Sequence, residues 1–295
     1  AYAYGDKYMK KTLRMGDLLE LDAPSVQHRL KVIIDSKNLV LENVYNQEPL
    51  SYDEIMEWCR SQAEFFKDYI CDVGTLLGAA ADQGKNILFE AQLGALRDID
   101  YGIYPFTSSS NTIASYAPIG AGIPGCALDN VVGVMKAYST CVGEGPFVAE
   151  TAMGEAWNEK LRESGGEFGA ATGRPRRVGP FDAVASRYGI RCQKAQDIAL
   201  TKLDVLGAFD KIPVITGYRL HGVLLDSFPT DSRLEEAEPV IEELPGWGCD
   251  ISGCRSWKDL PENARKYVCT LEKLVDHPIY LVSTGAERDA YLLRE

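Results

Sequence analysis

Short apolar segments that run directly into polar or charged residues constrain the fold of this chain most. Residues 86–90, 198–203, 213–220 and 278–282 each have the pattern of a buried strand. An amphipathic helix is expected at 262–275, just before the last of these strands. Strands that alternate with helices are typical of α/β proteins with a mainly parallel sheet. The sequence therefore predicts a central, mostly parallel β-sheet flanked by helices.

Helical patterns account for further stretches. A capping box at 51–54 is expected to open a helix whose apolar residues recur at helical spacing. Further helices are expected at 73–82 and at 128–138, while 150–165 is expected to be a charged amphipathic insertion. No internal repeat or linker divides the chain, so we expect a single large domain over residues 1–295.

The composition excludes several classes of protein. A net charge of −12 disfavours broad binding to nucleic acid or to an anionic membrane, so any basic site must be local. No apolar stretch approaches the roughly 20 residues that span a bilayer. The eight cysteines contain no CxxC pair and no dense framework, which predicts free thiols and a cytoplasmic protein.

The strongest candidate for a ligand site is the run from Gly169 to Gly179, which we call the arginine loop. It places three arginines among glycines and a threonine. Glycine lets a backbone approach a ligand closely, and a guanidinium group offers a planar fork of donors for carboxylate or phosphate. A solvated basic turn is the plain alternative. The run predicts a loop that binds a carboxylate or phosphate group, and the family resemblance given below implies a small dicarboxylate.

Two other segments have the composition of a guanine site. Thr201-Lys202-Leu203-Asp204, the guanine segment, follows an apolar strand. Asp204 can accept hydrogen bonds from N1–H and the 2-amino group of guanine, whereas adenine has neither donor. The stem of Lys202 can lie along the base. Ser283-Thr284-Gly285 ends another strand, and its backbone N–H groups can reach the guanine O6. Each segment alone also fits a solvated turn.

The arginine loop, the guanine segment and the run around Ser283, in this order, resemble adenylosuccinate synthetases, the GTP-dependent enzymes that join L-aspartate to IMP. The run 89–112 is similar to the family's FEGAQG and LLDIDHGTYPFVTSSNT, and 136–147 is similar to KAYSTRVGAGPF. Near the start, 4–7 and 13–18 are similar to AYxDK and LRVGDL. The resemblance runs from about residue 4 to 294.

The resemblance implies the P-loop-NTPase-like fold of these synthetases and a homodimer that acts in the AMP branch of purine biosynthesis. It implies that GTP, with Mg²⁺, phosphorylates O6 of IMP, and that the amine of aspartate then displaces phosphate from C6. In the family the phosphate loop, the catalytic Asp and His and the magnesium ligands lie upstream of where this chain begins. No catalytic or metal-binding residue is therefore expected within it.

The resemblance also assigns binding residues. The IMP side comprises Lys10, Gln92, Ser108, Val142 and Arg174, with Lys10 near the IMP site of the partner subunit. The aspartate site comprises Ala170, Ala171, Thr172, Gly173, Arg174, Pro175 and Arg176. The GTP site comprises Arg176, Lys202, Leu203, Asp204, Ser283, Thr284 and Gly285.

Several positions depart from the family pattern. Gln92 stands one place early, and Leu93 fills the place of the glutamine that contacts the purine. Either Gln92 takes that role in a rebuilt loop or the contact is lost. We favour the first, because only a polar side chain pairs with a buried purine edge. Lys10 and Cys141 each replace an arginine, and Pro175 interrupts the arginine run.

Two alternatives to a complete synthetase stay open. The chain does not begin with Met and contains no GxxxxGKS/T phosphate loop, so we expect a fragment of a longer protein. The first alternative is therefore a truncated module that binds nucleotide or only dimerises. The other alternative is a related ligase with a different nucleotide acceptor.

We expect the purified 295-residue protein not to turn over, because the resemblance places the base and the phosphate loop upstream. The measurement is release of phosphate from GTP in the presence of IMP and L-aspartate. Steady, aspartate-dependent release of phosphate would contradict this expectation.

Overall fold

The computed structural model describes residues 2–170 and 172–294. Two compact units divide the chain, and each is built from two segments: Ala1–Phe89 with Pro118–Cys126, and Glu90–Ala117 with Ala127–Glu295. We call the first pair unit 1 and the second pair unit 2. The expectation of a single large synthetase domain stays a prediction.

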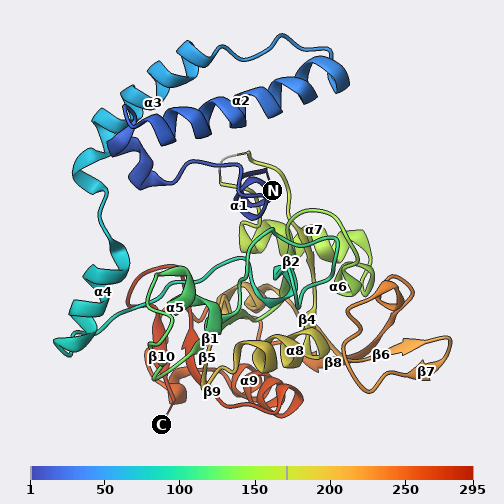
Figure 1. Ribbon diagram of the computed structural model, residues 1–295. Coiled ribbons are helices and arrows are strands. Elements are labelled where there is room, and N and C mark those ends of the chain that lie inside the picture. Colours follow the sequence, from blue (N-terminus) through green and yellow to red (C-terminus); the bar gives the residue numbers. More distant parts are fainter. Residues whose placement is uncertain (1, 171, 295) are drawn as a thin grey trace. The chain divides into compact units, whose positions relative to one another are not determined.

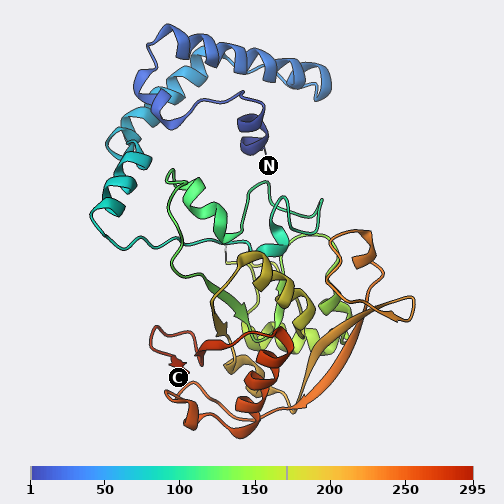
Figure 2. The same cartoon turned by 60° about the horizontal axis from the view of Figure 1, so that its bottom comes forward.

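Unit 1 is helical (Figure 1). Its helices are α1 (Tyr2–Tyr8), α2 (Pro24–Val44), α3 (Tyr52–Phe66) and α4 (Val73–Asp82), and most of the short α5 (Ala117–Gly120) also belongs to it. Helices α2 and α3 lie side by side in both views (Figures 1 and 2) and contribute to one small apolar cluster. The side chain of Ser51 accepts from the N–H of Glu54 at 3.4 Å, so the serine half of the predicted capping box is confirmed. The helix predicted at 73–82 is α4.

Unit 2 contains the parallel sheet. Its strands, in spatial order, are β1 (Val132–Lys136), β5 (Asp197–Thr201), β9 (Ile279–Ser283) and β10 (Tyr291–Leu293). The first three run parallel, and β10 joins the edge antiparallel. Helices α8 (Ala183–Gln193) and α9 (Glu262–Val275) pack on each other beside this sheet (Figure 1). The predicted α/β class and mostly parallel central sheet are confirmed.

A second sheet is organised around the long strand β6 (Lys211–Leu220). Strand β6 pairs parallel with β4 (Phe181–Asp182), and antiparallel with β7 (Val223–Leu224) and β8 (Glu238–Pro245). The remaining elements are the ribbon of β2 (Ser139–Cys141) with β3 (Arg177–Gly179), and the helices α6 (Val148–Thr151) and α7 (Glu155–Gly165). Strand β3 is the last part of the arginine loop, so its pairing with β2 anchors that end of the loop.

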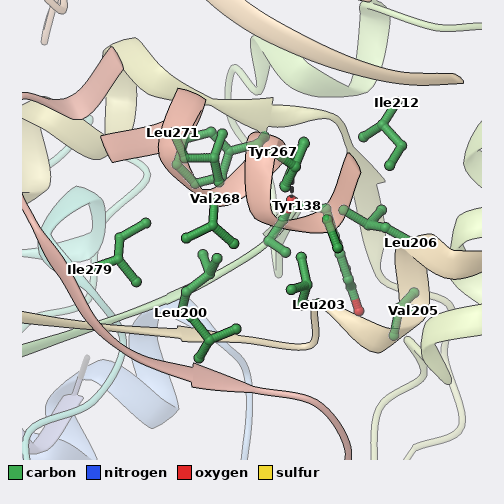
Figure 3. Close-up of a cluster of buried hydrophobic side chains, with 14 of the residues drawn as sticks. Tyr138, Leu200, Leu203, Val205, Leu206, Ile212, Tyr267, Val268, Leu271 and Ile279 are labelled. Carbon is green, nitrogen blue, oxygen red and sulfur yellow. Dashed lines mark hydrogen bonds between the residues drawn. The ribbon is translucent and has the colours of Figure 1, made fainter. Parts of the chain in front are cut away.

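Among its described residues, unit 2 has two buried apolar clusters, and one of them includes the residues between the parallel sheet and α9 (Figure 3). Leu200 of β5 and Ile279 of β9 are buried with Val268 and Leu271 of α9. The hydroxyl of Tyr267 donates to the carbonyl of Ala137 at 2.7 Å, so its polar end is satisfied inside the core. The apolar face predicted for 262–275 is therefore confirmed as the face that covers the sheet.

Two predicted elements are wrong. Residues 128–138 contain the strand β1 instead of a helix, because a short apolar run does not distinguish the two and the pairing with β5 decides. Residues 86–90 form no strand among the described residues, and Leu88 is 92% exposed. An apolar run becomes a strand only where a neighbouring strand can accept its backbone hydrogen bonds.

None of the helices that the structure describes has both the length and the apolar character needed to cross a bilayer.

Two adjacent leucines of β10 test the packing of the sheet. Leu292 is 2% exposed and Leu293 is 48% exposed, because successive strand residues face opposite sides. We expect Leu292→Ala to lower the free energy of unfolding by about 2–5 kcal/mol, because it leaves a cavity. Leu293→Ala, the matched control, should cost less than about 1 kcal/mol. Urea unfolding of both variants is the measurement, and equal losses would contradict the assigned faces.

Candidate functional site

Three parallel strands end at one edge of the sheet in unit 2. Lys136 at the end of β1 is in register with Thr201 at the end of β5, and Leu200 is in register with Val282 of β9. The guanine segment and the turn that begins at Ser283 therefore leave the sheet at the same edge. Ligands of α/β proteins usually bind at this carboxyl edge.

Asp204 presents an unsatisfied acceptor at this edge. It opens the short helix η5 (Asp204–Ala208), directly after Leu203, which is fully buried in the core cluster with Tyr138 (Figure 3). The Oδ1 atom of Asp204 is buried and has no hydrogen-bond partner among the described residues. Burial raises the pKa of this carboxyl, and the backbone N–H groups of Asp204 and Val205 and the nearby charge of Lys202 oppose that effect. A buried acceptor without a donor is costly, so this oxygen suits a ligand that brings one.

A pocket of about 370 Å³ opens beside this carboxylate. Its lining residues are Ser164, Asp204, Val205, Gly207, Ala208, Cys249 and Asp250. Asp250 caps its own turn, because its carboxylate accepts from the N–H of Ser252 at 2.8 Å and from its hydroxyl at 2.9 Å. Asp204 is thus the carboxylate that remains available on this wall.

The turn after β9 is held by its own hydrogen bonds. The hydroxyl of Ser283 donates to the carbonyl of Gly285 at 2.9 Å. Thr284 is fully buried. Its N–H donates to the carbonyl of Ala290 at 2.8 Å, and its hydroxyl donates to the carbonyl of Cys254 at 3.3 Å. The three predicted residues therefore form a fixed turn beside the guanine segment.

A buried carboxylate that the sequence did not reveal gathers the cations of this edge. Glu167 is fully buried, and its Oε1 lies 2.8 Å from Nζ of Lys136, 2.6 Å from the hydroxyl of Tyr138 and 3.2 Å from Nζ of Lys202. Its Oε2 lies 2.8 Å from Nη1 of Arg176. The side chains of the three cations stay 26–38% exposed. The cations can therefore meet a ligand that Glu167 itself cannot reach.

The cluster carries excess positive charge. Burial would raise the pKa of Glu167, but the hydrogen bonds from Lys136, Tyr138 and Arg176 outweigh it and lower this pKa to about 2. Burial lowers the pKa of Lys136, and the ion pair with Glu167 opposes this. One ionised carboxylate thus faces Lys136, Lys202 and Arg176. An anionic ligand would balance the remaining charge.

Glu167 also closes the base of the arginine loop. Helix α7 ends at Gly165, and Gly166 takes a left-handed φ of 60° that turns the chain. The N–H of Arg176 donates to the carbonyl of Glu167 at 2.9 Å. The N–H of Gly169 donates to the carbonyl of Arg174 at 2.8 Å, one step further into the loop. The two arms of the loop therefore meet beside Glu167, whose carbonyl binds the N–H of Arg176 and whose carboxylate binds the guanidinium of the same residue.

The tip of the arginine loop is exposed. The predicted aspartate-site residues that lie there are Ala170, Thr172, Gly173, Arg174 and Pro175. Ala171 lies outside the described residues. Arg176 is the predicted aspartate-site residue that lies near the guanine segment, because Arg176 and Lys202 both bind the carboxylate of Glu167.

On the predicted IMP side, Arg97 ties two loops together. Its guanidinium donates to the carbonyls of Val142 at 3.0 Å and Glu144 at 3.2 Å, and to Sγ of Cys141 at 2.7 Å. Its carbonyl accepts from the N–H and the hydroxyl of Ser108, at 2.8 and 3.0 Å. The structure thus joins the loops of Ser108 and Val142, although the hydroxyl of Ser108 bonds within its own loop.

Other predicted IMP residues are not brought into these contacts. Gln92 and Leu93 are exposed, and Leu93 takes a left-handed φ of 72°. Lys10 belongs to unit 1, where it is exposed directly after α1. The purine contact of Gln92 and the intersubunit contact of Lys10 stay predictions.

Sequence reasoning missed Glu167, Lys136 and Arg97 as organising residues. A signal for Glu167 exists, since an acid stands between the helix-ending Gly165-Gly166 pair and the arginine run. Nothing local distinguishes Lys136 or Arg97 from a surface cation, because their partners are distant in sequence.

Comparisons with known proteins agree in one family. The family model described as adenylosuccinate synthetase matches residues 1–292. Over 291 residues the chain is 44% identical to the adenylosuccinate synthetase of Pelobacter propionicus and 45% identical to that of Trichlorobacter lovleyi. These matches cover 98% of this chain and 67% and 66% of the relatives, so the chain spans about two thirds of their length.

A solved structure is similar as well. It is described as the fully ligated adenylosuccinate synthetase from Plasmodium falciparum, with 32% identity and a TM-score of 0.89. The match covers 99% of this chain and 68% of that one.

The pKa of Glu167 predicts how stability depends on pH. Its folded pKa of about 2 lies below the ordinary value of 4.5, so its stabilising effect is present above pH 4.5 and is lost as pH falls toward 2. We expect the stability difference between wild type and Glu167→Gln to shrink by about 3 kcal/mol across that window. Urea unfolding at several pH values measures it.

Asp182→Asn is the matched control. Asp182 is 4% exposed, and burial raises the pKa of its carboxyl. The stability of wild type relative to Asp182→Asn should therefore rise as pH falls, whereas the stability of wild type relative to Glu167→Gln should fall. Parallel profiles for wild type and Glu167→Gln would contradict the assignment.

Proposed function

The chain belongs to the adenylosuccinate synthetase family, and from that premise we propose that it takes part in the GTP-dependent ligation of L-aspartate to IMP. The observation that carries this proposal is Asp204, whose buried, unpartnered Oδ1 stands at the carboxyl edge of the sheet beside the turn of Ser283. A guanine brings two adjacent donors, N1–H and the 2-amino group, to such a carboxylate, whereas adenine brings neither. The products are adenylosuccinate, GDP and phosphate.

In the proposed GTP site, Asp204 accepts from N1–H and the 2-amino group of the base. Lys202 lies along the base, and the turn Ser283-Thr284-Gly285 faces O6. Arg176 supplies positive charge toward the nucleotide. The excess charge of the Glu167 cluster supports this assignment, because a nucleoside triphosphate is strongly anionic.

In the proposed aspartate site, the tip of the arginine loop closes over the dicarboxylate. Arg174 is exposed there and offers a forked donor for a carboxylate. It also approaches IMP, whose remaining contacts are Gln92, Ser108, Val142 and, from the partner subunit, Lys10. The bond network of Arg97 supports a common site for Ser108 and Val142.

The reaction has two steps. N1 of IMP gives its proton to the base that the family resemblance places upstream of this chain. O6 then attacks the γ-phosphorus of GTP, so that GDP leaves and 6-phosphoryl-IMP forms. The amine of aspartate then attacks C6, the C–O bond breaks, and phosphate leaves. The residues of this chain bind and orient the three substrates.

Magnesium is the cofactor that the family implies. Among residues 2–170 and 172–294, no three or more His, Cys, Asp or Glu side chains are grouped to hold a metal ion. Because magnesium commonly binds through one or two carboxylates together with the phosphates of a substrate, this finding does not test the ion, and we assign it none of the described residues.

Isothermal titration of GTP, ATP and IMP, with and without L-aspartate, tests the proposal. We expect GTP and IMP to bind, and GTP to bind more tightly than ATP. Binding of GTP without IMP would point to a different nucleotide acceptor. Binding of neither nucleotide would refute the proposed function.

A substitution tests the role of Asp204 directly. Asp204→Asn should weaken the binding of GTP by about 10- to 100-fold. The variant loses the charge-assisted hydrogen bonds and turns an amide N–H toward the 2-amino group, which is also a donor. The same variant should gain affinity for XTP, whose C2 carbonyl accepts from that amide.

Asp197→Asn serves as the control for this substitution. Asp197 lies at the opposite end of β5, where it accepts from the side chain of Asn130 at 2.7 Å. Its variant should keep the preference for GTP. Unchanged base preference in Asp204→Asn would contradict the assigned guanine contact.

A further inference from the structure

One buried carboxylate joins two segments that bind different substrates in the proposed function. Arg176 stands just before β3, and Lys202 stands just after β5, so their meeting at Glu167 is a tertiary contact. We propose that Glu167 is a positioning residue that couples the arginine loop to the guanine segment, so that aspartate and GTP strengthen each other's binding. This inference rests on the proposed function for the identity of the two ligands.

The geometry makes the coupling rigid. Arg176 binds Oε2 of Glu167, whereas Lys202 binds Oε1, and the two oxygens belong to one planar group. A movement of Arg176 that rotates this carboxylate therefore moves the partner of Lys202. Tyr138 and Lys136 also hold Oε1, which restricts the carboxylate to few orientations.

A second bond strengthens the tie on the side of the guanine segment. Nζ of Lys202 donates to the carbonyl of Gly165 at 2.6 Å, two residues before Glu167. Lys202 itself takes a left-handed φ of 59°, which a non-glycine residue keeps only where its surroundings hold it. The guanine segment is therefore tied to the turn that joins α7 to the arginine loop.

Burial explains why this role belongs to Glu167 and not to the ligand-facing cations. Glu167 is fully buried, so water cannot replace it when it is removed. Arg176 and Lys202 remain 32% and 38% exposed and keep surface for a ligand. Glu167 thus acts on GTP through Lys202 and Arg176, and on aspartate through the arginine loop that carries Arg176.

Hydrogen exchange of the ligand-free protein tests the physical tie. We expect Glu167→Gln, which keeps the shape and removes the charge, to speed exchange in both 166–176 and 199–204. Glu167→Asp keeps the charge and should restore part of the protection. Asp182→Asn removes a different buried carboxylate, which binds Tyr218 and the N–H of Ala185, and should leave both segments protected.

Titration of GTP with IMP present, with and without saturating L-aspartate, tests the functional coupling. In wild type and Asp182→Asn we expect aspartate to lower the dissociation constant of GTP by about fivefold or more. In Glu167→Gln this factor should fall to about one, and Glu167→Asp should lie between.

The outcomes separate the two proposals. If wild type binds no GTP, the proposed function fails, and the exchange experiment still decides whether Glu167 ties the segments. If wild type binds GTP and aspartate has no effect, or has the same effect in Glu167→Gln, the coupling is overturned. Unchanged exchange in either segment of Glu167→Gln also overturns it.

Discussion

Parallel pairing of β1, β5 and β9 is the constraint on which the candidate site depends. Parallel strands point the same way, so their last residues must leave at one edge of the sheet. Lys136, the guanine segment and the turn at Ser283 all meet there because of this direction. The core beneath, built from Leu200, Ile279 and the apolar face of α9, holds the strands in register.

Bringing three cations to one edge has an electrostatic cost, and Glu167 offsets part of it. A buried ion pair seldom stabilises a fold more than apolar packing of the same volume would. The presence of Glu167 is therefore better explained by what it positions than by the stability that it adds. One carboxylate shared by Lys136, Lys202 and Arg176 keeps these side chains together and leaves positive charge for a ligand.

Local patterns predicted a large part of the fold. The cap at Ser51, the helix at 73–82 and the apolar face of α9 depend on residues within a few turns, and each is confirmed. The patterns failed at 128–138 and 86–90, because an apolar run becomes a strand only when another strand pairs with it. The sequence predicted Asp204 because this residue follows a strong strand pattern. It did not predict Glu167, because the partners of Glu167 are distant in sequence.

The sequence by itself determined the α/β class, the residues of the guanine segment and arginine loop, and the family to which they are similar. These depend on residue types and on their order along the chain. Only the tertiary structure decided that Glu167 joins Lys136, Arg176 and Lys202, and that Oδ1 of Asp204 is buried without a partner. Burial and charge pairing depend on distances between segments, and these distances arise only when the sheet pairs and the core packs.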